Sequence, residues 1–182
     1  MKNVLMLGDS IRMQYTPKVK ELLKGRANVY GPVDNGRWSD YTLNSLRFWL
    51  PQLPDPDIVH WNNGIWDMGD DYDEGFPHVS LEDYEKNVVR IFRVLRKLVS
   101  PDIKIIAATT IPWINANMEQ LAQYNEAIRR AAAEEGVALD DLYTAFRPDM
   151  EKLIGPDKVH MNEDGIRLTS GLVAKSIEPY LE

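Results

Sequence analysis

Short apolar runs alternate with longer amphipathic stretches along the whole 182-residue chain. A brief apolar run suits a strand that is buried on both faces, and helices cover both faces of a sheet when its strands run parallel. The pattern therefore predicts five βα units in a three-layer α/β/α sandwich. The predicted strands are 4–7, 27–30, 58–61, 104–108 and 137–139, and the predicted helices are 16–24, 39–50, 80–99, 118–135 and 162–181.

Five such units fit one domain spanning residues 1–182, because a chain of this length builds one sizeable core and is too short for two ordinary domains. The common solution at this size is a flavodoxin-like five-stranded parallel sheet with the order 2-1-3-4-5. Ligands bind beyond the carboxyl ends of such strands, near the point between strands one and three where the order reverses. We therefore expect the loops that begin at Gly8 and Asn62 to face one crevice.

Composition restricts the partners and the chemistry. The net charge is −7 and there is no long basic cluster, so neither nucleic acid nor an anionic membrane is a predicted partner. The chain has no cysteine, which leaves an oxygen or an amine as the nucleophile and excludes disulfides. The four apolar residues after Met1–Asn3 are fewer than the roughly 7 to 15 of a secretory signal, which predicts a cytoplasmic protein. Composition indicates no oligomeric state.

A candidate nucleophile follows the first strand. Gly8 permits a tight turn there, and Ser10 then lies beside a helix N-terminus at the mouth of the crevice. A serine hydroxyl is a weak nucleophile until an imidazole accepts its proton, and that imidazole needs an acceptor to fix its tautomer. His160, with Asp157 three residues before it, supplies both groups from the last loop. The alternative is simple capping of the two helices, by Asp9 or Ser10 for one and His160 for the other.

The remaining histidines have weaker contexts. His60 lies in a predicted strand and is expected to be a core residue, whereas His78 belongs to the acidic loop 67–77 and is expected to be solvated. That loop lacks the central glycine and the alternating ligand spacing of an EF-hand, so we predict no metal site. The carboxylates concerned are Asp67, Asp70, Asp71, Asp73 and Glu74.

Acyl transfer also needs hydrogen-bond donors for the tetrahedral oxyanion. Gly36, in Asn35-Gly36 after the second strand, has an approachable N–H, and Asn62-Asn63 before Gly64 offer side-chain amides. Turn formation is the alternative explanation for both segments. Because side chains alternate along a strand, only one of Asn62 and Asn63 can face the crevice.

Aromatic and basic side chains near the crevice are open to two interpretations. Tryptophans in loops on that side could stack on a sugar or hold an acyl chain, or they could simply cap the core. Arg12 and Arg37 could favour an acidic substrate or could pair with local acids. The loop tryptophans are Trp38, Trp66 and Trp113, whereas Trp49 and Trp61 are predicted core residues.

Together these segments resemble the SGNH hydrolases of the GDSL type over nearly the whole chain. The resemblance implies that Ser10 is the nucleophile and an oxyanion donor, that Gly36 and an asparagine are the other donors, that His160 is the general base and acid, and that Asp157 orients it. No cofactor is implied. The resembling segments are 4–10, 35–36, 62–67, 124–128, 141–143 and 157–160.

The third block departs from the usual Gly-x-Asn-Asp pattern, since Trp66 stands where the asparagine is expected. A family variant with the pattern Asn-x-Gly-Leu-x-Asp matches Asn62, which is the preferred donor, with Asn63 as the second choice.

The implied activity is hydrolysis of carboxylic esters of a small molecule or carbohydrate, with short acyl groups such as a sugar O-acetyl group as the first candidate. Thioesterase and lysophospholipase-like activities are the alternatives. From another class, a flavodoxin-like module that binds FMN or phosphate would share the sheet, but the Asp9 carboxylate would repel a phosphate at the first loop. An inactive relative without a working oxyanion hole is a further alternative.

Overall fold

The computed structural model describes residues 1–71 and 74–182. Its sheet has five strands in the order β2-β1-β3-β4-β5, and every neighbouring pair is parallel. This confirms the predicted fold class and strand order. The strands are β1 (Lys2–Gly8), β2 (Ala27–Tyr30), β3 (Ile58–Asn62), β4 (Lys104–Ala108) and β5 (Ala138–Asp140).

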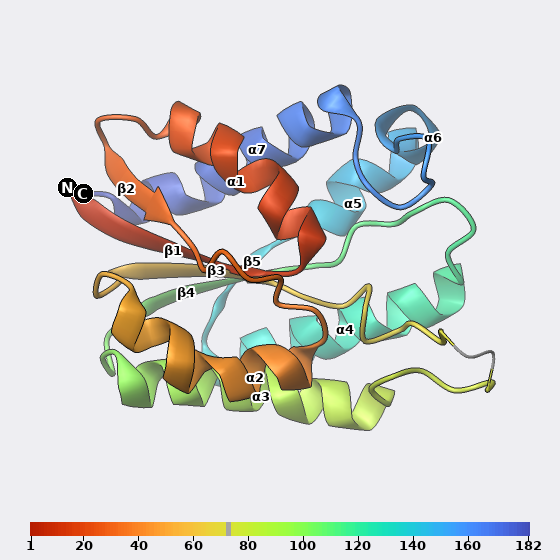
Figure 1. Ribbon diagram of the computed structural model, residues 1–182, viewed down its shortest axis with the longest axis horizontal. Coiled ribbons are helices and arrows are strands. Elements are labelled where there is room, and N and C mark those ends of the chain that lie inside the picture. The colour runs from red at the N-terminus through yellow and green to blue at the C-terminus, as the bar shows by residue number, and fades with distance from the viewer. Residues whose placement is uncertain (72–73) are drawn as a thin grey trace.

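Helices cover both faces of this sheet (Figure 1). One face carries α1 (Ser10–Leu22) and α7 (Glu163–Ile177), which pack against each other. The opposite face carries α2 (Ser39–Trp49), α3 (Leu81–Leu98) and α4 (Met118–Glu135). The segment between β5 and α7 forms two short helices, α5 (Leu142–Phe146) and α6 (Met150–Leu153). Single 3-10 turns lie at Leu50–Gln52, Arg147–Asp149 and Glu178–Tyr180.

Side-chain caps fix the helix starts. The Ser80 hydroxyl accepts the Asp83 N–H at the start of α3, and the Asn162 side chain caps α7, both as predicted. Helix α1 begins earlier than predicted, because the Asp9 carboxylate accepts the Ile11 N–H at 2.9 Å and caps the helix at Ser10. The cap therefore fixes where Ser10 lies.

Residues of the strands alternate between two cores, as the pleat of a sheet requires. Trp61 of β3 is fully buried on the α2–α4 side, which confirms its prediction as a core residue. Ile58 packs on the α1–α7 side, and by alternation His60 and Asn62 share that face. The next side chain, that of Asn63, points to the opposite face, where its Oδ1 accepts the Thr42 hydroxyl of α2 at 3.2 Å.

A buried polar chain joins α1 to the sheet. His60 is fully buried, and its Nε2 lies 3.0 Å from Asp140 Oδ2. Its Nδ1 lies 3.4 Å from the Tyr15 hydroxyl of α1. His60 is thus a hydrogen-bonded core residue, as predicted, and it belongs to the scaffold beneath the crevice.

Candidate active site

The loop before α7 brings His160 to the N-terminus of α1. His160 Nε2 lies 2.8 Å from Ser10 Oγ, although the two residues are 150 positions apart in the sequence. On the other side of the ring, His160 Nδ1 lies 2.7 Å from Asp157 Oδ2. The predicted hydroxyl, imidazole and carboxylate therefore form one continuous hydrogen-bonded chain at the carboxyl edge of the sheet.

Asp157 is held as a carboxylate by its own loop. Its Oδ1 accepts the backbone N–H groups of Val159 at 3.0 Å and His160 at 2.9 Å. These two backbone hydrogen bonds make the largest contributions to lowering the pKa of Asp157 to about 2, and the hydrogen bond to the imidazole makes the next largest. The carboxylate is consequently charged at neutral pH and can stabilise a protonated imidazole.

Gln14 fixes the position of this loop, and the sequence reasoning missed it. Its side-chain amide donates to the Met161 carbonyl oxygen at 3.1 Å, and its Oε1 accepts the Met161 N–H at 3.0 Å. Gln14 lies one turn after Ser10 on α1, so a single helix carries both the hydroxyl and the clamp for the histidine loop. The four-residue spacing from Ser10 is the only sequence signal for this role.

Close backbone contacts explain two glycines of the crevice. A Cβ at Gly8, which has a φ of +144°, would lie 2.1 Å from the Asn62 carbonyl oxygen, and a Cβ at Gly36 would lie 2.5 Å from the Gly8 carbonyl oxygen. The Gly36 N–H, expected to face the oxyanion, donates to this same Gly8 oxygen at 2.9 Å. In this structure Gly36 therefore joins the β2–α2 loop to the turn that carries Ser10.

The other expected oxyanion donors differ in their hydrogen-bond partners. The Ser10 N–H is the first amide of α1 and has no partner within the helix. The Asn62 side-chain amide faces the α1–α7 side and contacts the Thr109 carbonyl oxygen at 3.3 Å, which is longer than a typical hydrogen bond. The Asn63 amide donates to the Arg37 carbonyl oxygen on the opposite side. Alternation along β3 thus turns Asn62 toward the Ser10 side of the sheet and Asn63 away from it.

Arg12 binds backbone, in contrast to its interpretation as a residue that contacts substrate. Its guanidinium is buried, with 4% exposure. It donates to the carbonyl oxygens of Gly8, Pro32 and Asp34, the last at 2.8 Å. These bonds hold the β2–α2 loop against the turn before Ser10.

Two buried carboxyl groups lie behind the crevice. Desolvation raises the pKa of Asp9 to about 7 and the pKa of Asp67 to about 6. Asp67 accepts the Ser39 N–H at 2.9 Å and so joins the loop after β3 to the start of α2. Each acid keeps one buried oxygen without a partner among the described residues. Their raised pKa values shift the titration of both groups toward neutral pH.

A family model places the chain among known enzymes. The model of the GDSL-like Lipase/Acylhydrolase family matches residues 6–168, a range that includes Ser10, Asp157 and His160. The chain belongs to this family. As a family member it is a carboxylic ester hydrolase, and the predicted resemblance is confirmed.

Solved structures share the fold of this GDSL-family esterase. An acetylxylan esterase from Geobacillus stearothermophilus superposes with a TM-score of 0.76 at 20% identity, covering 97% of this chain and 94% of that one. A lipase/acylhydrolase from Enterococcus faecalis superposes with a TM-score of 0.81 at 15% identity, covering 100% and 98%. No curated protein sequence matches the chain.

The tryptophans around the candidate site are partly buried, and they contact both the core and the surface. Trp38 packs against the core and its ring centroid lies 6.0 Å from that of Trp66. Trp113 also packs against the core. His78, expected to be solvated, is an exposed residue, and its ring centroid also lies 5.7 Å from that of Trp38. Trp49, predicted as core, is half-buried and lines a surface cavity.

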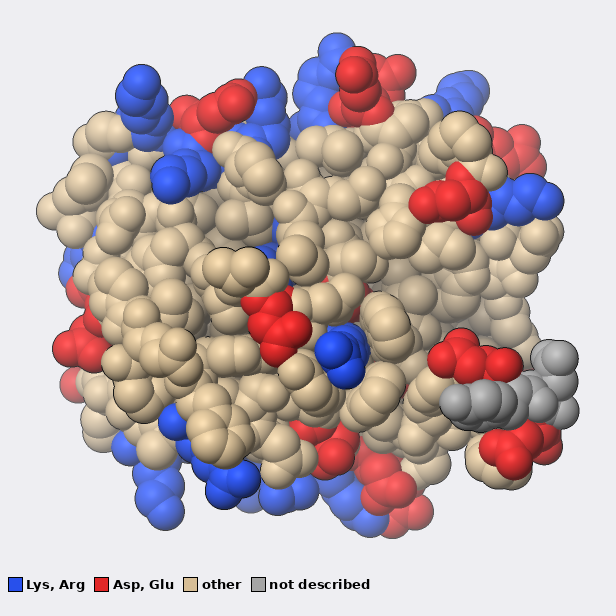
Figure 2. Space-filling model, viewed as in Figure 1, with Lys and Arg blue, Asp and Glu red and all other residues tan. Residues whose placement is uncertain are grey.

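The surface and the acidic loop add little further chemistry. Figure 2 shows charged side chains of both signs along the margins of one face, and one acidic and one basic group side by side near its centre. Within residues 1–71 and 74–182, no three acidic or histidine side chains gather as metal ligands. In the same part of the chain, no helix has both the length and the apolarity to cross a bilayer. Asp73 of the acidic loop lies outside the described residues.

Proposed function

We propose that this esterase works by acyl transfer, with Ser10 as nucleophile, His160 as general base and acid, and Asp157 as the residue that orients His160. The observation that carries the proposal is the hydrogen-bonded chain of Ser10 Oγ, the two His160 nitrogens and Asp157 Oδ2, with contacts of 2.8 and 2.7 Å. Nucleophile and base within such a distance, and a base oriented by a third group, are the requirements for activating a serine.

The roles follow from the two ring nitrogens. Asp157 Oδ2 accepts a hydrogen bond from the Nδ1–H of His160, so Nε2 presents its lone pair to the Ser10 hydroxyl. As Ser10 Oγ attacks the ester carbonyl carbon, Nε2 takes the hydroxyl proton and then delivers it to the departing alkoxide. A water molecule next gives a proton to Nε2 and attacks the acyl-enzyme, and the collapse returns that proton to Ser10 Oγ. The acid product leaves, and the ionised Asp157 stabilises the imidazolium in both halves.

The oxyanion requires donors near Ser10. The free Ser10 N–H at the positive end of α1 is the first proposed donor. The Asn62 amide is the second, because its contact with the Thr109 carbonyl oxygen is long at 3.3 Å and a developing negative charge is the stronger acceptor. Gly36 is proposed as the third, and its N–H would have to exchange the Gly8 oxygen for the oxyanion.

The proposed substrate is an ester with a short acyl group, in particular an acetyl group on a carbohydrate. The fold is shared with acetyl xylan esterases, and half-buried aromatic rings adjoin the crevice loops. Aromatic rings of this kind suit a sugar ring. A comparison of p-nitrophenyl acetate with p-nitrophenyl octanoate tests the preference, and faster turnover of the octanoate would contradict it.

The test of the triad is Ser10→Ala assayed with p-nitrophenyl acetate, together with labelling by a fluorophosphonate probe. We expect a loss of roughly 10³-fold or more in kcat and no labelling. Ser176→Ala is the matched control, since among the described residues this α7 hydroxyl bonds only the Val173 carbonyl oxygen, at 2.8 Å, and it should keep full activity and labelling. Activity of Ser10→Ala equal to that of the control would end the assignment.

A further inference from the structure

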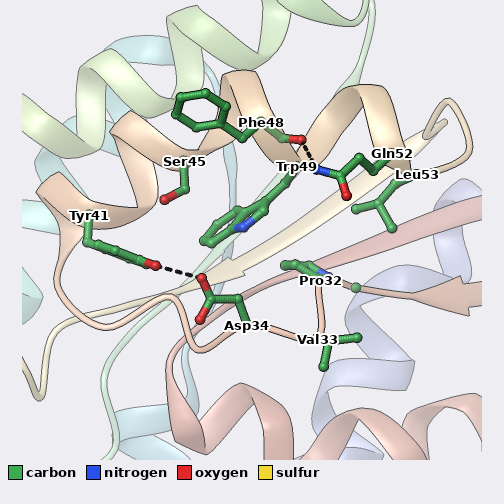
Figure 3. Close-up of a pocket in the computed structure, with 10 residues that line it drawn as sticks. Pro32, Val33, Asp34, Tyr41, Ser45, Phe48, Trp49, Gln52 and Leu53 are labelled. Carbon is green, nitrogen blue, oxygen red and sulfur yellow. Dashed lines mark hydrogen bonds between the residues drawn. The ribbon is translucent and has the colours of Figure 1, made fainter.

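A cavity of about 550 Å³ lies beside the edge strand β2, outside the triad. Its walls are the β2–α2 loop on one side and α2 on the other. Figure 3 shows the Trp49 indole in the middle of this cavity, with the Asp34 carboxylate, the Ser45 hydroxyl and Pro32 around it. A volume of this size is in the range of small-ligand sites.

We propose that this cavity binds a sugar unit of a neutral oligosaccharide whose acetyl ester is presented to Ser10. The inference rests on the proposed function and extends it to the substrate class. It depends on three features: the chemistry of the cavity wall, the connection of that wall to the Ser10 turn, and a row of aromatic rings that leads away from it.

The wall combines one aromatic platform with polar groups at its edge. Asp34 Oδ2 accepts the Tyr41 hydroxyl at 2.6 Å, and no described residue donates to Oδ1. Gln52 uses its amide N–H on the Phe48 carbonyl oxygen at 2.7 Å, which leaves its Oε1 as an acceptor. A sugar ring matches this arrangement, because its C–H face packs on an aromatic ring while its hydroxyl groups reach the polar rim.

Other ligand classes fit the same wall less well. Among the described residues no lysine or arginine lines the cavity, so an anion would meet only the Asp34 carboxylate. An acyl chain would desolvate Asp34 and Ser45 without compensation. For an ammonium group, the Tyr41 face is already covered by the Arg37 guanidinium, which lies 4.5 Å from the ring centroid, so only the Trp49 ring would remain for it.

The cavity wall is joined directly to the turn before the nucleophile. The Asp34 carbonyl oxygen accepts the Arg12 guanidinium at 2.8 Å, and two residues later the Gly36 N–H donates to the Gly8 carbonyl oxygen at 2.9 Å. Asp34 is two residues from Gly36 and Ser10 is two residues from Gly8, so Asp34 lies no more than about 20 Å from Ser10. A short oligosaccharide spans a distance of this order, so one such ligand can occupy the cavity and still present its ester to Ser10.

Aromatic rings continue from the cavity along the crevice side. The ring centroids of Trp49 and Tyr41 are 6.1 Å apart, those of Tyr41 and Trp38 are 6.2 Å apart, and those of Trp38 and Trp66 are 6.0 Å apart. The four half-buried rings form a band from the cavity to the loop after β3. The Trp49, Trp38 and Trp66 rings of this band can contact successive sugar units, whereas the Arg37 guanidinium already covers a face of Tyr41.

The test fills the cavity without touching the triad. Ser45→Phe adds an aromatic ring inside it, and Asn44→Phe adds the same ring one position earlier on α2, at an exposed residue that does not line the cavity. With acetylated xylotetraose we expect Ser45→Phe to lower kcat/KM by about tenfold. With p-nitrophenyl acetate both variants should stay within about twofold of the parent. An equal effect of the two variants on the tetrasaccharide ester would overturn the proposal.

Binding without turnover separates this proposal from the proposed function. Ser10→Ala, titrated by calorimetry with xylotetraose, cellotetraose and mannotetraose, should bind at least one of them saturably and lose this binding when Ser45→Phe is added. No saturable binding of any of the three overturns the sugar site even if Ser10 proves to be the nucleophile. Saturable binding in a protein whose Ser10→Ala variant keeps full esterase activity would overturn the triad and leave the sugar site standing.

Discussion

Replacing Gly36 by alanine tests the link between the β2–α2 loop and Ser10, the proposed nucleophile. The new Cβ would lie 2.5 Å from the Gly8 carbonyl oxygen and 2.7 Å from its carbonyl carbon, whereas ordinary contact begins at 3.4 Å. Both neighbours are backbone atoms, so the loop has to retreat by the difference of about 0.9 Å. A displacement of this size at a catalytic site costs roughly 10²-fold in rate. The crowding should also destabilise the fold by about 2 kcal/mol.

The assay is kcat/KM for p-nitrophenyl acetate at a temperature where circular dichroism shows the variant to be folded. Gly171→Ala is the matched control, because a Cβ at this interior position of α7 meets nothing within 4 Å. We expect the control to keep full activity and to gain roughly 0.5 to 1 kcal/mol in the free energy of unfolding. The reasoning is refuted if folded Gly36→Ala hydrolyses the ester as fast as the control.

Three further predictions concern the charges and the clamp around the site. Asp157→Asn should lower kcat on p-nitrophenyl acetate by between about 10² and 10⁴-fold, because the amide favours the wrong imidazole tautomer; an unchanged kcat would contradict the role of Asp157. The pKa of Asp67 is about 6 in the fold against 3.8 as its ordinary value, so the folded state keeps a proton that the unfolded state loses, and the free energy of unfolding should fall as pH rises from about 4 to 6. In urea titrations at several pH values, Asp67→Asn should remove the Asp67 share of that fall, on the order of 3 kcal/mol, and leave the share of Asp9, whose pKa is also raised; parallel curves for the two proteins would rule out the effect. Gln14→Ala releases Met161 and should lower kcat by about tenfold, whereas the exposed Gln123→Ala should not; equal kcat values for both would show that the clamp is not needed.

Much of the fold could be predicted from the sequence because its signals are local. Buried strands appear as apolar runs, and the caps Ser80 and Asn162 mark helix starts within one turn. Helix α1 is the main error. It contains Pro17 in its interior, where proline is disfavoured, so local rules place its start too late. The short helices α5 and α6 span too few residues for a periodic pattern to appear.

The candidate site was predictable in its residues and less so in its contacts. The spacing of Asp157 and His160 on one loop, and the place of Ser10 after a strand, follow from sequence and sheet topology. The partner of the Gly36 N–H does not, because it depends on how closely two distant backbone segments approach. The same holds for Arg12, whose carbonyl partners lie on another loop, and for Trp49, whose α2 lies beside the sheet edge and leaves the ring half-buried. Tertiary placement decides each of these cases.

If His160 activates Ser10 as proposed, their contact also determines when hydrolytic capability can arise. Translation produces Ser10 among the first residues, yet its proposed base follows 150 positions later. A nascent chain lacking the final loop therefore carries an unactivated hydroxyl, however well its earlier strands have paired. Competence for hydrolysis should appear in one step, when α7 docks on α1, and the slow closure of so long a loop should set its timing.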